Sequence, residues 1–400
     1  MSIEMIETDG FHSGTQIKVI GVGGGGSNAV EHMISRHVQG VEFICANTDA
    51  QALSRSNASM TVQLGTSGLG AGSKPDKGRE AAEAAADDIR QAIRGAHMLF
   101  ITAGMGGGTG TGAAPVIARI AKDMGILTVG VVTKPFDWEG GRRLTNAEAG
   151  LTELEANVDS LVVVLNEKLL EVLGDDITQE EAFAQANDVL KNAVGGIAEI
   201  ITYPGLVNVD FEDVRTVMGE MGRAMMGSAA AAGVDRARIA AEQAVASPLL
   251  EGVNLSGAKG VLVNITAAKG NLKMKEVNEV MNTVKAFAAE DAHIIFGAVY
   301  DELMGDALRV TVVATGLGQA AAVVRSKPEL ITQPVLVQAQ ATGTHDAVAF
   351  GSTPDYSHLD VPAVLRGRGQ RGGSNVTVEA LANSGVDRYD IPAFLRKQAD

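Results

Sequence analysis

The sequence predicts an α/β protein in which a parallel sheet covered by helices is followed by a long helix and a second, smaller α/β unit. Two patterns carry this prediction. From about Ile17 to Leu165, apolar β-branched runs alternate with helical segments, and such runs are typical of strands buried on both faces of a parallel sheet. A long amphipathic segment then separates this part of the chain from a second set of apolar runs.

The strands predicted for the first unit are short and apolar. Their sequences are IKVIGVG, VEFICAN, MLFITAG, ILTVGVVT and SLVVVLN, which begin at Ile17, Val41, Met98, Ile126 and Ser160. Ala-rich helical segments such as GREAAEAAADDIRQAI lie between them. Because helical crossovers connect parallel strands, we expect all the carboxyl ends of these strands to meet at one edge of the sheet.

The long helix is predicted to begin near Thr178. The sequence TQEE is a capping box, in which the Thr178 hydroxyl caps the helix while Glu181 reaches back to the Thr178 amide. The helical pattern ends at Tyr203-Pro204-Gly205, because proline disfavours helix at the residue before it. The predicted helix has about 25 residues and is therefore roughly 38 Å long.

The second α/β unit extends to about Leu317. Its helix, LKMKEVNEVMNTVKAFAAE, is predicted to have one apolar face, formed by Met274, Val277, Val280, Met281, Val284 and Phe287. The apolar runs GVLVNITA, HIIFGAVY and LRVTVVATG are expected to form a smaller sheet with mixed strand directions.

Both ends of the chain differ from these units. Residues 1–14 are predicted to be a flexible N-terminus, and residues 318–385, rich in Gln, Ala, Gly, Ser and Pro, a disordered linker. Residues 386–400 form a short tail in which Ile391, Phe394 and Leu395 have the spacing of a helical face. A segment this small cannot fold alone, so its apolar residues suggest a peptide that docks on a partner.

Composition excludes several classes of protein. The hydrophobic content of 46% allows a sizeable core, and no run approaches the roughly 18 apolar residues of a membrane span. The acidic N-terminus lacks the order of a signal peptide, so we expect a cytoplasmic protein without membrane insertion. Cys45 is the only cysteine, which excludes an intramolecular disulfide. The net charge of −15 argues against a general nucleic-acid binder.

The first glycine cluster, GVGGGGSNAVEHM, directly follows a predicted strand. Gly21, Gly23 and Gly26 satisfy the pattern G-x-G-x-x-G, and Asp49 follows near the end of the next strand. This is the form of the Rossmann dinucleotide fingerprint, in which a helix N-terminus presents N–H groups to an anion. The alternative is a tight turn that binds no ligand, although four consecutive glycines exceed what a turn needs.

Two further glycine loops follow strands. One is GMGGGTGTGAAP, in which Thr109 and Thr111 are predicted to be helix caps and Pro115 to lie in the first helical turn. The other is GLGAGSKP, from Gly68. Three such loops at one sheet edge could hold several phosphates with backbone amides and helix dipoles, without the lysine of a P-loop. Together the three loops indicate a nucleoside triphosphate.

Two polar segments complete the candidate site. In TKPFDWEGGRR, which begins at Thr133, Glu139 could accept hydrogen bonds from ribose hydroxyls and Arg143 could bind phosphate, although read alone both are surface charges. In NVDFEDVR, Asp210 and Asp213 lie close enough to hold a cation or to orient water together. The alternative for the two aspartates is an acidic helix start, and the residues alone favour that interpretation.

These residues fall into motifs that resemble one protein family. The motifs are GVGGGGSNAV, NTDAQAL, GGGTGTG, TKPF, NVDFEDVRTVM and DIPAFLRKQAD. GGGTGTG is the tubulin signature, and with the others the chain resembles the FtsZ family, the bacterial cell-division homologues of tubulin, over residues 17–317 and again at the tail. The resemblance implies a tubulin-like, Rossmann-type GTPase domain at residues 15–177, a central helix at 178–203 and a C-terminal α/β domain at 204–317, with a catalytic loop at 204–213.

The resemblance also implies GTP as substrate with Mg²⁺ on its phosphates, and filaments that form a ring at mid-cell. Carried over by motif, the GTP-binding residues are Gly24, Gly25, Gly26, Ser27, Asn28, Gly70, Ala71, Gly72, Gly108, Thr109, Gly110, Thr133, Glu139, Arg143, Phe183 and Asn187. In the family, the loop at residues 70–72 faces the γ-phosphate, Phe183 and Asn187 flank the guanine, and the aspartates matching Asp210 and Asp213 act in hydrolysis.

Helix geometry adds a consequence for hydrolysis. Asn187 and Thr202 are separated by roughly 22 Å along a helix, so Asp210 and Asp213 lie out of reach of the nucleotide in the same chain. They can reach only the nucleotide of a neighbour, which requires subunits stacked head to tail. Hydrolysis in trans would therefore couple GTP turnover to assembly.

The tail carries the last implied function. Its sequence matches the family peptide that binds membrane tethers and regulators of the division ring. The matching residues are Asp390, Ile391, Pro392, Phe394, Leu395 and Arg396.

The segment DVPAVLR at 360–366 repeats DIPAFLR at 390–396 with Val364 in place of Phe394. We interpret it as a second, weaker docking copy, because the loss of an aromatic anchor lowers affinity. Chance similarity in a Pro- and Ala-rich linker is the alternative.

Departures from the family are small. Trp138 stands where the family more often has Phe, and Gly141 where a basic residue is common; both could alter turnover.

Two other functions are the alternatives. A nicotinamide-dependent oxidoreductase would explain the first glycine loop but not the second. A structural polymer that binds GTP without hydrolysing it would leave Asp210 and Asp213 without a role.

Overall fold

The computed structural model describes residues 14–174, 176–202, 207, 209–219, 222–247, 258–289 and 292–317. The chain divides into two compact units, Met1–Lys327 and Pro328–Asp400, and all described residues belong to the first. The predicted linker, the tail peptide, its upstream copy and the predicted helix end at 203–205 lie outside the described residues. So does most of the predicted N-terminal segment.

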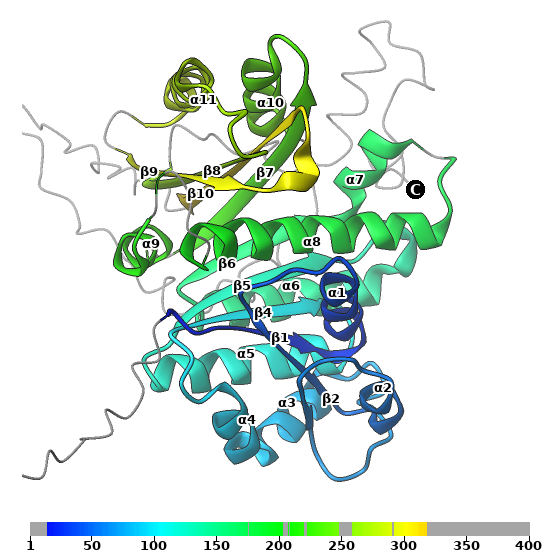
Figure 1. Cartoon of the computed structure of the whole chain (residues 1–400). Helices are drawn as coiled ribbons and strands as arrows, with labels where there is room; N and C mark the ends of the chain where they lie inside the picture. Colours follow the sequence, from blue (N-terminus) through cyan, green and yellow to red (C-terminus); the bar gives the residue numbers. More distant parts are fainter. Residues whose placement is uncertain are drawn as a thin grey trace, which may run out of the picture. The chain divides into compact units, whose positions relative to one another are not determined.

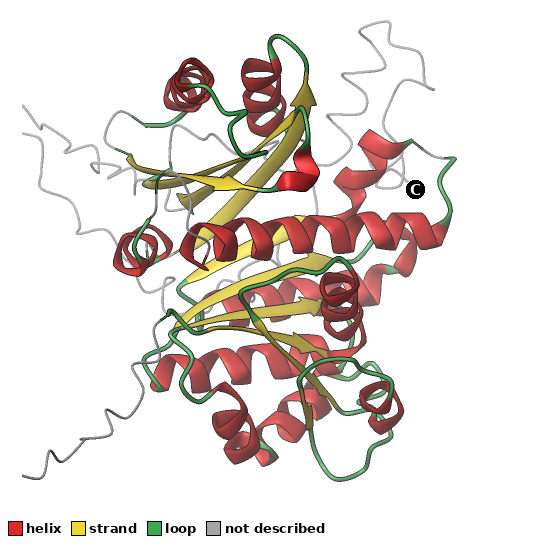
Figure 2. Cartoon of the chain, in the orientation of Figure 1, coloured by secondary structure: helices red, strands yellow, loops and turns green. Residues whose placement is uncertain are grey.

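The described residues form one sheet of ten strands covered by helices (Figures 1 and 2). The strands are β1 Ile17–Val22, β2 Glu42–Asn47, β3 Met60–Gln63, β4 Met98–Gly104, β5 Leu127–Lys134, β6 Ser160–Leu165, β7 Gly222–Ala232, β8 Gly260–Ala267, β9 His293–Tyr300 and β10 Ala307–Leu317. The helices are α1 Gly23–Ser35, α2 Ala50–Ser54, α3 Pro75–Ala84, α4 Ala86–Ile93, α5 Thr109–Asp123, α6 Gly141–Glu155, α7 Asn166–Leu173, α8 Gln179–Thr202, α9 Phe211–Met218, α10 Arg236–Val245 and α11 Met274–Phe287, with short 3₁₀ turns η1 Asp137–Glu139 and η4 Glu302–Met304.

Nine of the ten strands run in the same direction. The order across the sheet is β3-β2-β1-β4-β5-β6-β7-β10-β8-β9, and β10 alone is antiparallel, to β7 on one side and β8 on the other. The five strands predicted for the first unit are confirmed, as are the mixed directions in the second. Because the other strands are parallel, their carboxyl ends share one edge of the sheet.

The predicted separation into two sheets is wrong, because β7 joins them. It pairs in parallel with β6 from Ser160↔Gly222 to Val162↔Ala224 and antiparallel with β10 from Arg223 to Ala232. Its sequence, GRAMMGSAAAA, contains no β-branched residue, so the pattern that marks the other strands is missing. Pairing with neighbours on both sides makes this segment a strand in spite of its composition.

The central helix α8 lies between the first strands and the C-terminal part of the sheet (Figure 1). Together with α1 and α9 it contributes to one apolar core, while α3 to α6 form a second core on the opposite face of the first strands. A third core lies between α10, α11 and strands β7, β8 and β10. The first core includes residues from strands near both ends of the sheet, such as Cys45 of β2 and Val299 of β9, so α8 is packed on both sides.

The predicted capping box at the start of α8 is confirmed. The Thr178 amide donates to Glu181 Oε2 at 2.9 Å, and the Glu181 amide donates to Thr178 Oγ1 at 3.2 Å. The Thr178 amide and hydroxyl both donate to the Glu181 carboxylate and lower the pKa of that carboxyl. The helix extends over 24 residues, which corresponds to about 36 Å. No helix among the described residues combines the length and apolar character that a membrane span requires.

Two helix predictions need correction. The segment predicted as one helix, GREAAEAAADDIRQAI, belongs to two helices, α3 and α4, that meet at Ala85. The predicted apolar face of α11 holds at Val277, Val280 and Val284, which are buried, but Met274 and Phe287 are 67% and 48% exposed. These two are the first and last residues of the helix, where a side chain has neighbouring turns on one side only.

Candidate functional site

A cavity of about 460 Å³ opens at the carboxyl edge of the sheet. Its walls come from the start of α1, the segment between β4 and α5, the end of β5, the start of α6, the first residue of α7 and the first turns of α8. This volume lies in the range of sites that bind small molecules. The position agrees with the general rule that ligands of parallel α/β sheets bind outside the carboxyl ends of the strands.

Most of the sequence-predicted binding residues lie in this wall. They are Gly24, Gly25, Asn28, Gly108, Thr109, Gly110, Thr133, Glu139, Arg143, Phe183 and Asn187. Five others do not line the cavity: Gly26, Ser27, Gly70, Ala71 and Gly72. The tertiary fold therefore brings together residues from six separate segments, and leaves part of two glycine loops behind the wall.

The first glycine loop forms the first turn of α1, which begins at Gly23. A Cβ on Gly24 would meet no atom within 4 Å, whereas one on Gly26 would lie 2.3 Å from the carbonyl oxygen of Thr102. Gly26 is therefore required for packing against β4. Gly24 lies open to the cavity, and the first amides of a helix have no intrahelical acceptor, so they are available to an anion.

The second glycine loop becomes helical earlier than predicted. Helix α5 begins at Thr109 with Gly108 as its N-cap, so Pro115 lies inside the helix and not in its first turn. The predicted caps Thr109 and Thr111 do not cap it. Thr109 Oγ1 instead lies 2.6 Å from Thr48 Oγ1, and Thr111 Oγ1 accepts from the Gly106 amide at 2.8 Å.

The glycines of α5 allow α3 to pack directly on its first turns. A Cβ on Gly112 would lie 1.9 Å from the carbonyl oxygen of Pro75, and one on Gly78 would lie 2.4 Å from that of Gly108. Close approach of two backbones is thus one reason for the glycines in GGGTGTG. At Gly107 a Cβ would meet no atom within 4 Å, and this residue lines the cavity.

The third glycine loop supports the second from behind. The Gly70 amide donates to the Thr48 carbonyl at 3.1 Å. A Cβ on Gly108 would lie 2.8 Å from the methyl group of Ala71. Only Ser73 of this loop lines the cavity, with a φ of 56°. Gly70 and Ala71 thus pack behind the wall, and Ser73 lines the cavity.

The acidic residue of the first fingerprint has a structural role. Asp49 caps α2 by accepting from the amides of Gln51 at 2.9 Å and Ala52 at 3.4 Å. In a dinucleotide-binding enzyme the acidic residue at this place would bind ribose. Because this carboxylate is engaged by helix amides, the oxidoreductase alternative loses its main polar contact.

Glu139 and Arg143 form an ion pair beside the cavity. The other oxygen of Glu139, Oε1, accepts from the Phe136 amide at 3.0 Å. The Glu139 side chain is 8% exposed and that of Arg143 is 48% exposed. The pair therefore places a fixed carboxylate in the wall and a guanidinium that can turn toward a ligand.

Aromatic rings lie at the α8 end of the cavity. Phe183 meets Phe136 edge to face at 5.4 Å between ring centroids, and Phe136 stacks on Trp138 at 5.5 Å. Phe183 is 38% exposed and lines the cavity. It offers a flat apolar surface on which a ring could stack.

Asn166 is a functional candidate that sequence reasoning missed. It lines the cavity, is 3% exposed, and its Oδ1 atom has no hydrogen-bond partner within the described part of the chain. A buried carbonyl oxygen without a partner is costly unless a ligand or water satisfies it. Its position directly after a strand end was the available signal. The other unpredicted lining residues are Ser73, Gly104, Met105, Gly107, Pro135, Ala186 and Leu190.

Asp210 and Asp213 lie away from this cavity. Asp210 is the N-cap of α9, and its Oδ1 accepts from the Asp213 amide at 2.8 Å; both side chains are exposed. The next residue, Phe211, meets His97 with ring centroids 6.1 Å apart, and His97 directly precedes β4. The two aspartates therefore lie at the amino edge of the sheet, opposite the cavity. The helix-start interpretation is correct for Asp210, and it leaves both carboxylates facing solvent.

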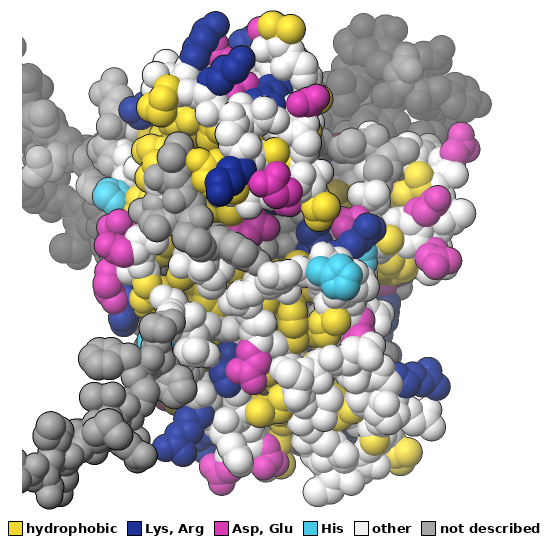
Figure 3. All heavy atoms as spheres, viewed as in Figure 1, with side chains coloured by type: hydrophobic (Ala, Val, Ile, Leu, Met, Phe, Trp, Pro, Cys, Tyr) yellow, Lys and Arg dark blue, Asp and Glu magenta, His cyan; other side chains and the backbone are white. Residues whose placement is uncertain are grey.

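Charge around the cavity is balanced. Glu139 and Arg143 are its only charged lining residues among those described. The described residues contain no group of three or more His, Cys, Asp or Glu side chains suited to a metal ion. On the face drawn in Figure 3, side chains of both signs are interspersed.

Comparisons with known proteins agree with this architecture. Residues 16–174 match the Tubulin/FtsZ family, GTPase domain, and residues 222–318 match the FtsZ family, C-terminal domain. The chain is 53% identical to the cell division protein FtsZ of Coxiella burnetii, with 96% of each chain covered. It is 52% identical to that of Pseudomonas aeruginosa, with 96% of this chain and 97% of the relative covered.

Solved structures give the same result. An empty FtsZ dimer from M. jannaschii is 43% identical, covers 76% of this chain and 88% of its own, and superposes with a TM-score of 0.72. The more distant CetZ1 of Haloferax volcanii, at 20% identity and a TM-score of 0.66, shares the fold. The glycine-walled cavity, the central helix and these matches together show that the chain belongs to the FtsZ family of tubulin-like GTPases and cell-division proteins.

Proposed function

We propose that the cavity binds GTP and that Asp210 and Asp213 act on GTP held by the next subunit of a head-to-tail polymer. One observation carries this proposal: the aspartates and the cavity lie at opposite edges of the sheet. Phe183 and Asn187, in the first turns of α8, line the cavity, while Asp210 follows the other end of the helix. The helix spans about 36 Å, so a single chain cannot bring its own carboxylates to its own nucleotide.

The cavity suits a guanine nucleotide in three respects. Phe183 offers a ring face for the base. Asn166 Oδ1, which has no hydrogen-bond partner among the described residues, and the side chain of Asn187 offer acceptors for the N–H groups on the Watson–Crick edge of guanine. The amides at the start of α1 and α5, which lack intrahelical acceptors, would bind the phosphates. Arg143 then adds the one cationic group of the described wall.

Mg²⁺ is expected to enter with the nucleotide. This ion prefers phosphate oxygens and water, with one or two carboxylates at most. The described residues hold no cluster that could bind it independently, which is consistent with a metal held mainly by the triphosphate. When bound, it would neutralise charge on the phosphates.

A contact between the cavity edge of one subunit and the amino edge of the next is heterologous, so it propagates into a filament. Filaments of this kind would form the division ring at mid-cell in the cytoplasm. The tail peptide at 386–400 would bind membrane tethers and regulators of that ring. Self-association is consistent with the dimer of the M. jannaschii relative.

Complementation between two inactive variants tests the trans arrangement. Gly24→Asp places a carboxylate where the phosphates are expected, in a position where a side chain has free space, and should abolish GTP binding. Asp213→Ala should bind GTP but not hydrolyse it. In an equal mixture, roughly a quarter of head-to-tail contacts join a GTP-bearing subunit to an intact Asp213.

Phosphate release and light scattering are followed in parallel after GTP addition. We expect each variant alone to be inactive and the mixture to recover a fraction of wild-type turnover. If Asp213→Ala still binds GTP but the mixture releases phosphate no faster than the two variants do separately, catalysis across subunits is excluded. Asp213→Ala that hydrolyses GTP normally would exclude the residue itself.

A further inference from the structure

The two helices that wall the cavity are tied to each other directly behind it. Helix α1 contributes Asn28 to the wall and α8 contributes Asn187. His32, one turn after Asn28, faces Asp188, the residue after Asn187, with Nε2 and Oδ1 2.9 Å apart. The bond therefore joins the helix that starts at the phosphate end of the cavity to the helix that carries the base end.

This tie is well enclosed and strongly charged. The side chains of His32 and Asp188 are 15% and 27% exposed. Arg36 Nη2 lies 3.9 Å from the second oxygen of Asp188. Lys191, one turn further along α8, is influenced by the same carboxylate, although burial lowers its pKa. Three basic side chains thus gather around a single acid.

The rest of the contact between α1 and α8 is apolar, with Val30, Met33 and Leu190 in the same core. Apolar packing sets the distance between helices but restricts sliding along them only weakly, because it is not directional. A hydrogen bond is directional, so the bond between one imidazole nitrogen and the Asp188 carboxylate fixes both register and rotation.

We propose that His32 is a positioning residue for the nucleotide: through Asp188 it holds the base-binding turn of α8 in register with the phosphate-binding turn of α1. The inference rests on the proposed GTP site. A nucleoside triphosphate spans both walls, so its affinity depends on their relative placement before it binds. A wall free to slide must be ordered by the ligand, and that ordering lowers the observed affinity.

The test measures GTP affinity by the fluorescence of Trp138, the only tryptophan of the chain, which stacks on Phe136 beside the cavity. His32→Ala should weaken GTP binding by about 5- to 20-fold, because a charge-assisted bond between the walls is lost. Turnover at saturating GTP and saturating protein should change less than about twofold, since His32 lies outside the reacting groups. His32→Gln, whose amide nitrogen can occupy the place of Nε2, should recover most of the affinity.

Glu31 provides a matched control on the same helix. It accepts from Ser56 Oγ at 2.7 Å, from the Asn57 amide at 2.7 Å and from Asn57 Nδ2 at 2.8 Å, so it ties α1 to a segment outside the cavity wall. Glu31→Ala should lower thermal stability without the loss of GTP affinity. Equal losses of affinity in Glu31→Ala and His32→Ala would reduce the effect to general destabilisation and overturn the inference.

A double-variant cycle gives the second measurement. In an Asp188→Ala background, which already lacks the acceptor of the bond, His32→Ala should have little further effect on GTP affinity. Fully additive losses would overturn the inference, because the two side chains would then act separately. Failure of the wild-type chain to bind GTP would refute the proposed function itself. If the wild-type chain binds GTP and His32→Ala binds it with the same affinity, only the positioning role of the His32–Asp188 bond is refuted.

Discussion

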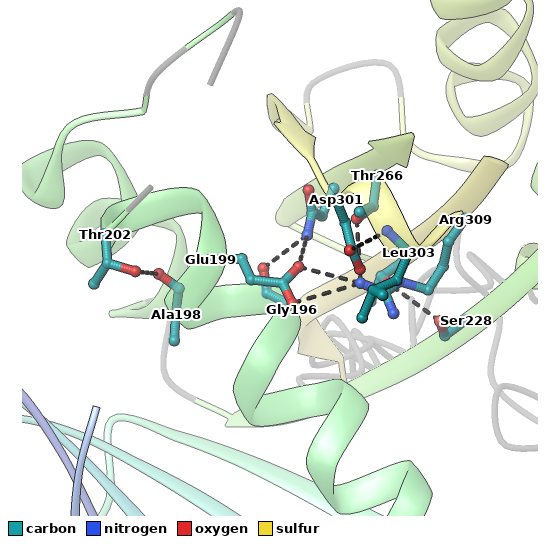
Figure 4. A network of polar contacts seen from close by, with 11 residues as sticks. Gly196, Ala198, Glu199, Thr202, Ser228, Thr266, Asp301, Leu303 and Arg309 are labelled. Carbon is teal, nitrogen blue, oxygen red and sulfur yellow. Dashed lines mark hydrogen bonds and ion pairs between the residues drawn. The ribbon is translucent and has the colours of Figure 1, made fainter. Parts of the chain in front are cut away.

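Glu199 and Arg309 form a polar contact between α8 and the C-terminal strands that should make stability depend on pH (Figure 4). Arg309 Nη2 lies 3.3 Å and 3.5 Å from the two carboxylate oxygens, and Asn264 Nδ2 lies 3.4 Å from one of them. The side chains are 27% and 20% exposed. Burial raises the pKa of Glu199, and the Arg309 charge opposes that rise only in part.

The perturbation is Arg309→Met, which removes the charge and keeps an apolar side chain of similar length. At pH 7.5 it leaves a largely buried carboxylate without its main counterion. Breaking a buried pair in this way costs about 3–5 kcal/mol. Because both groups retain some exposure and Lys191 still favours the Glu199 charge, we expect about 2–3 kcal/mol at this pH.

The sign of the pH dependence follows from proton linkage. A carboxyl whose folded pKa lies above 4.5, its usual value, binds a proton more readily in the folded state than in the unfolded state. The free energy of unfolding therefore falls as pH rises from the usual value through the folded pKa. Without Arg309 the folded pKa should rise further, so the variant should lose more stability than the wild type between pH 5.5 and 7.5.

Urea denaturation of the nucleotide-free chain at pH 5.5, 6.5 and 7.5 measures this directly. The loss caused by Arg309→Met should shrink toward low pH, and Glu199→Gln in the same chain should recover most of it at pH 7.5. Arg238→Met, which removes an exposed partner of Glu242 on α10, is the matched control and should show little change. A loss that is the same at all three pH values, or a double variant no more stable than Arg309→Met, would refute the reasoning.

Three further predictions concern assembly, packing and the tail. GTP turnover per subunit should rise with protein concentration and vanish below the assembly threshold; turnover that stays constant on dilution would contradict catalysis in trans. Gly112→Ala should destabilise the fold by about 3 kcal/mol or more in urea denaturation, because its Cβ would lie 1.9 Å from the Pro75 carbonyl oxygen. Gly24→Ala, where a Cβ meets no atom within 4 Å, should instead leave the free energy of unfolding unchanged or raise it by up to about 1 kcal/mol. A peptide of residues 355–370 should bind, more weakly, the protein that a 386–400 peptide captures; binding no better than that of a scrambled peptide would leave the repeat without a docking role.

Much of the fold could be predicted because it depends on local patterns. The buried strands are marked by continuous β-branched runs, and the start of α8 by a capping box that forms within four residues. Strand β7 could not be found in this way. Its alanines and glycines favour no strand locally, and only pairing with β6 and β10 gives the segment its conformation.

The candidate site, like the fold, could be predicted only where it depends on local patterns. Loops after parallel strands must gather at one edge, so the residues around Gly24, Gly108 and Thr133 could be expected to meet. Asn166 could not be selected, because its significance lies in a buried oxygen for which the described part of the chain supplies no partner. That is a property of its surroundings and not of its local sequence.

The sequence by itself determined the types of the main elements, the edge at which the glycine loops gather, and the separation of Asp210 from the nucleotide end by a long helix. These follow from backbone periodicity, capping and strand direction, which are encoded by neighbouring residues. Only the tertiary structure decided which glycines face the cavity and which, like Gly26 and Gly112, let two backbones approach. It also placed His32 against Asp188. Such contacts join residues far apart in the chain, and no local pattern specifies which segments will pack together.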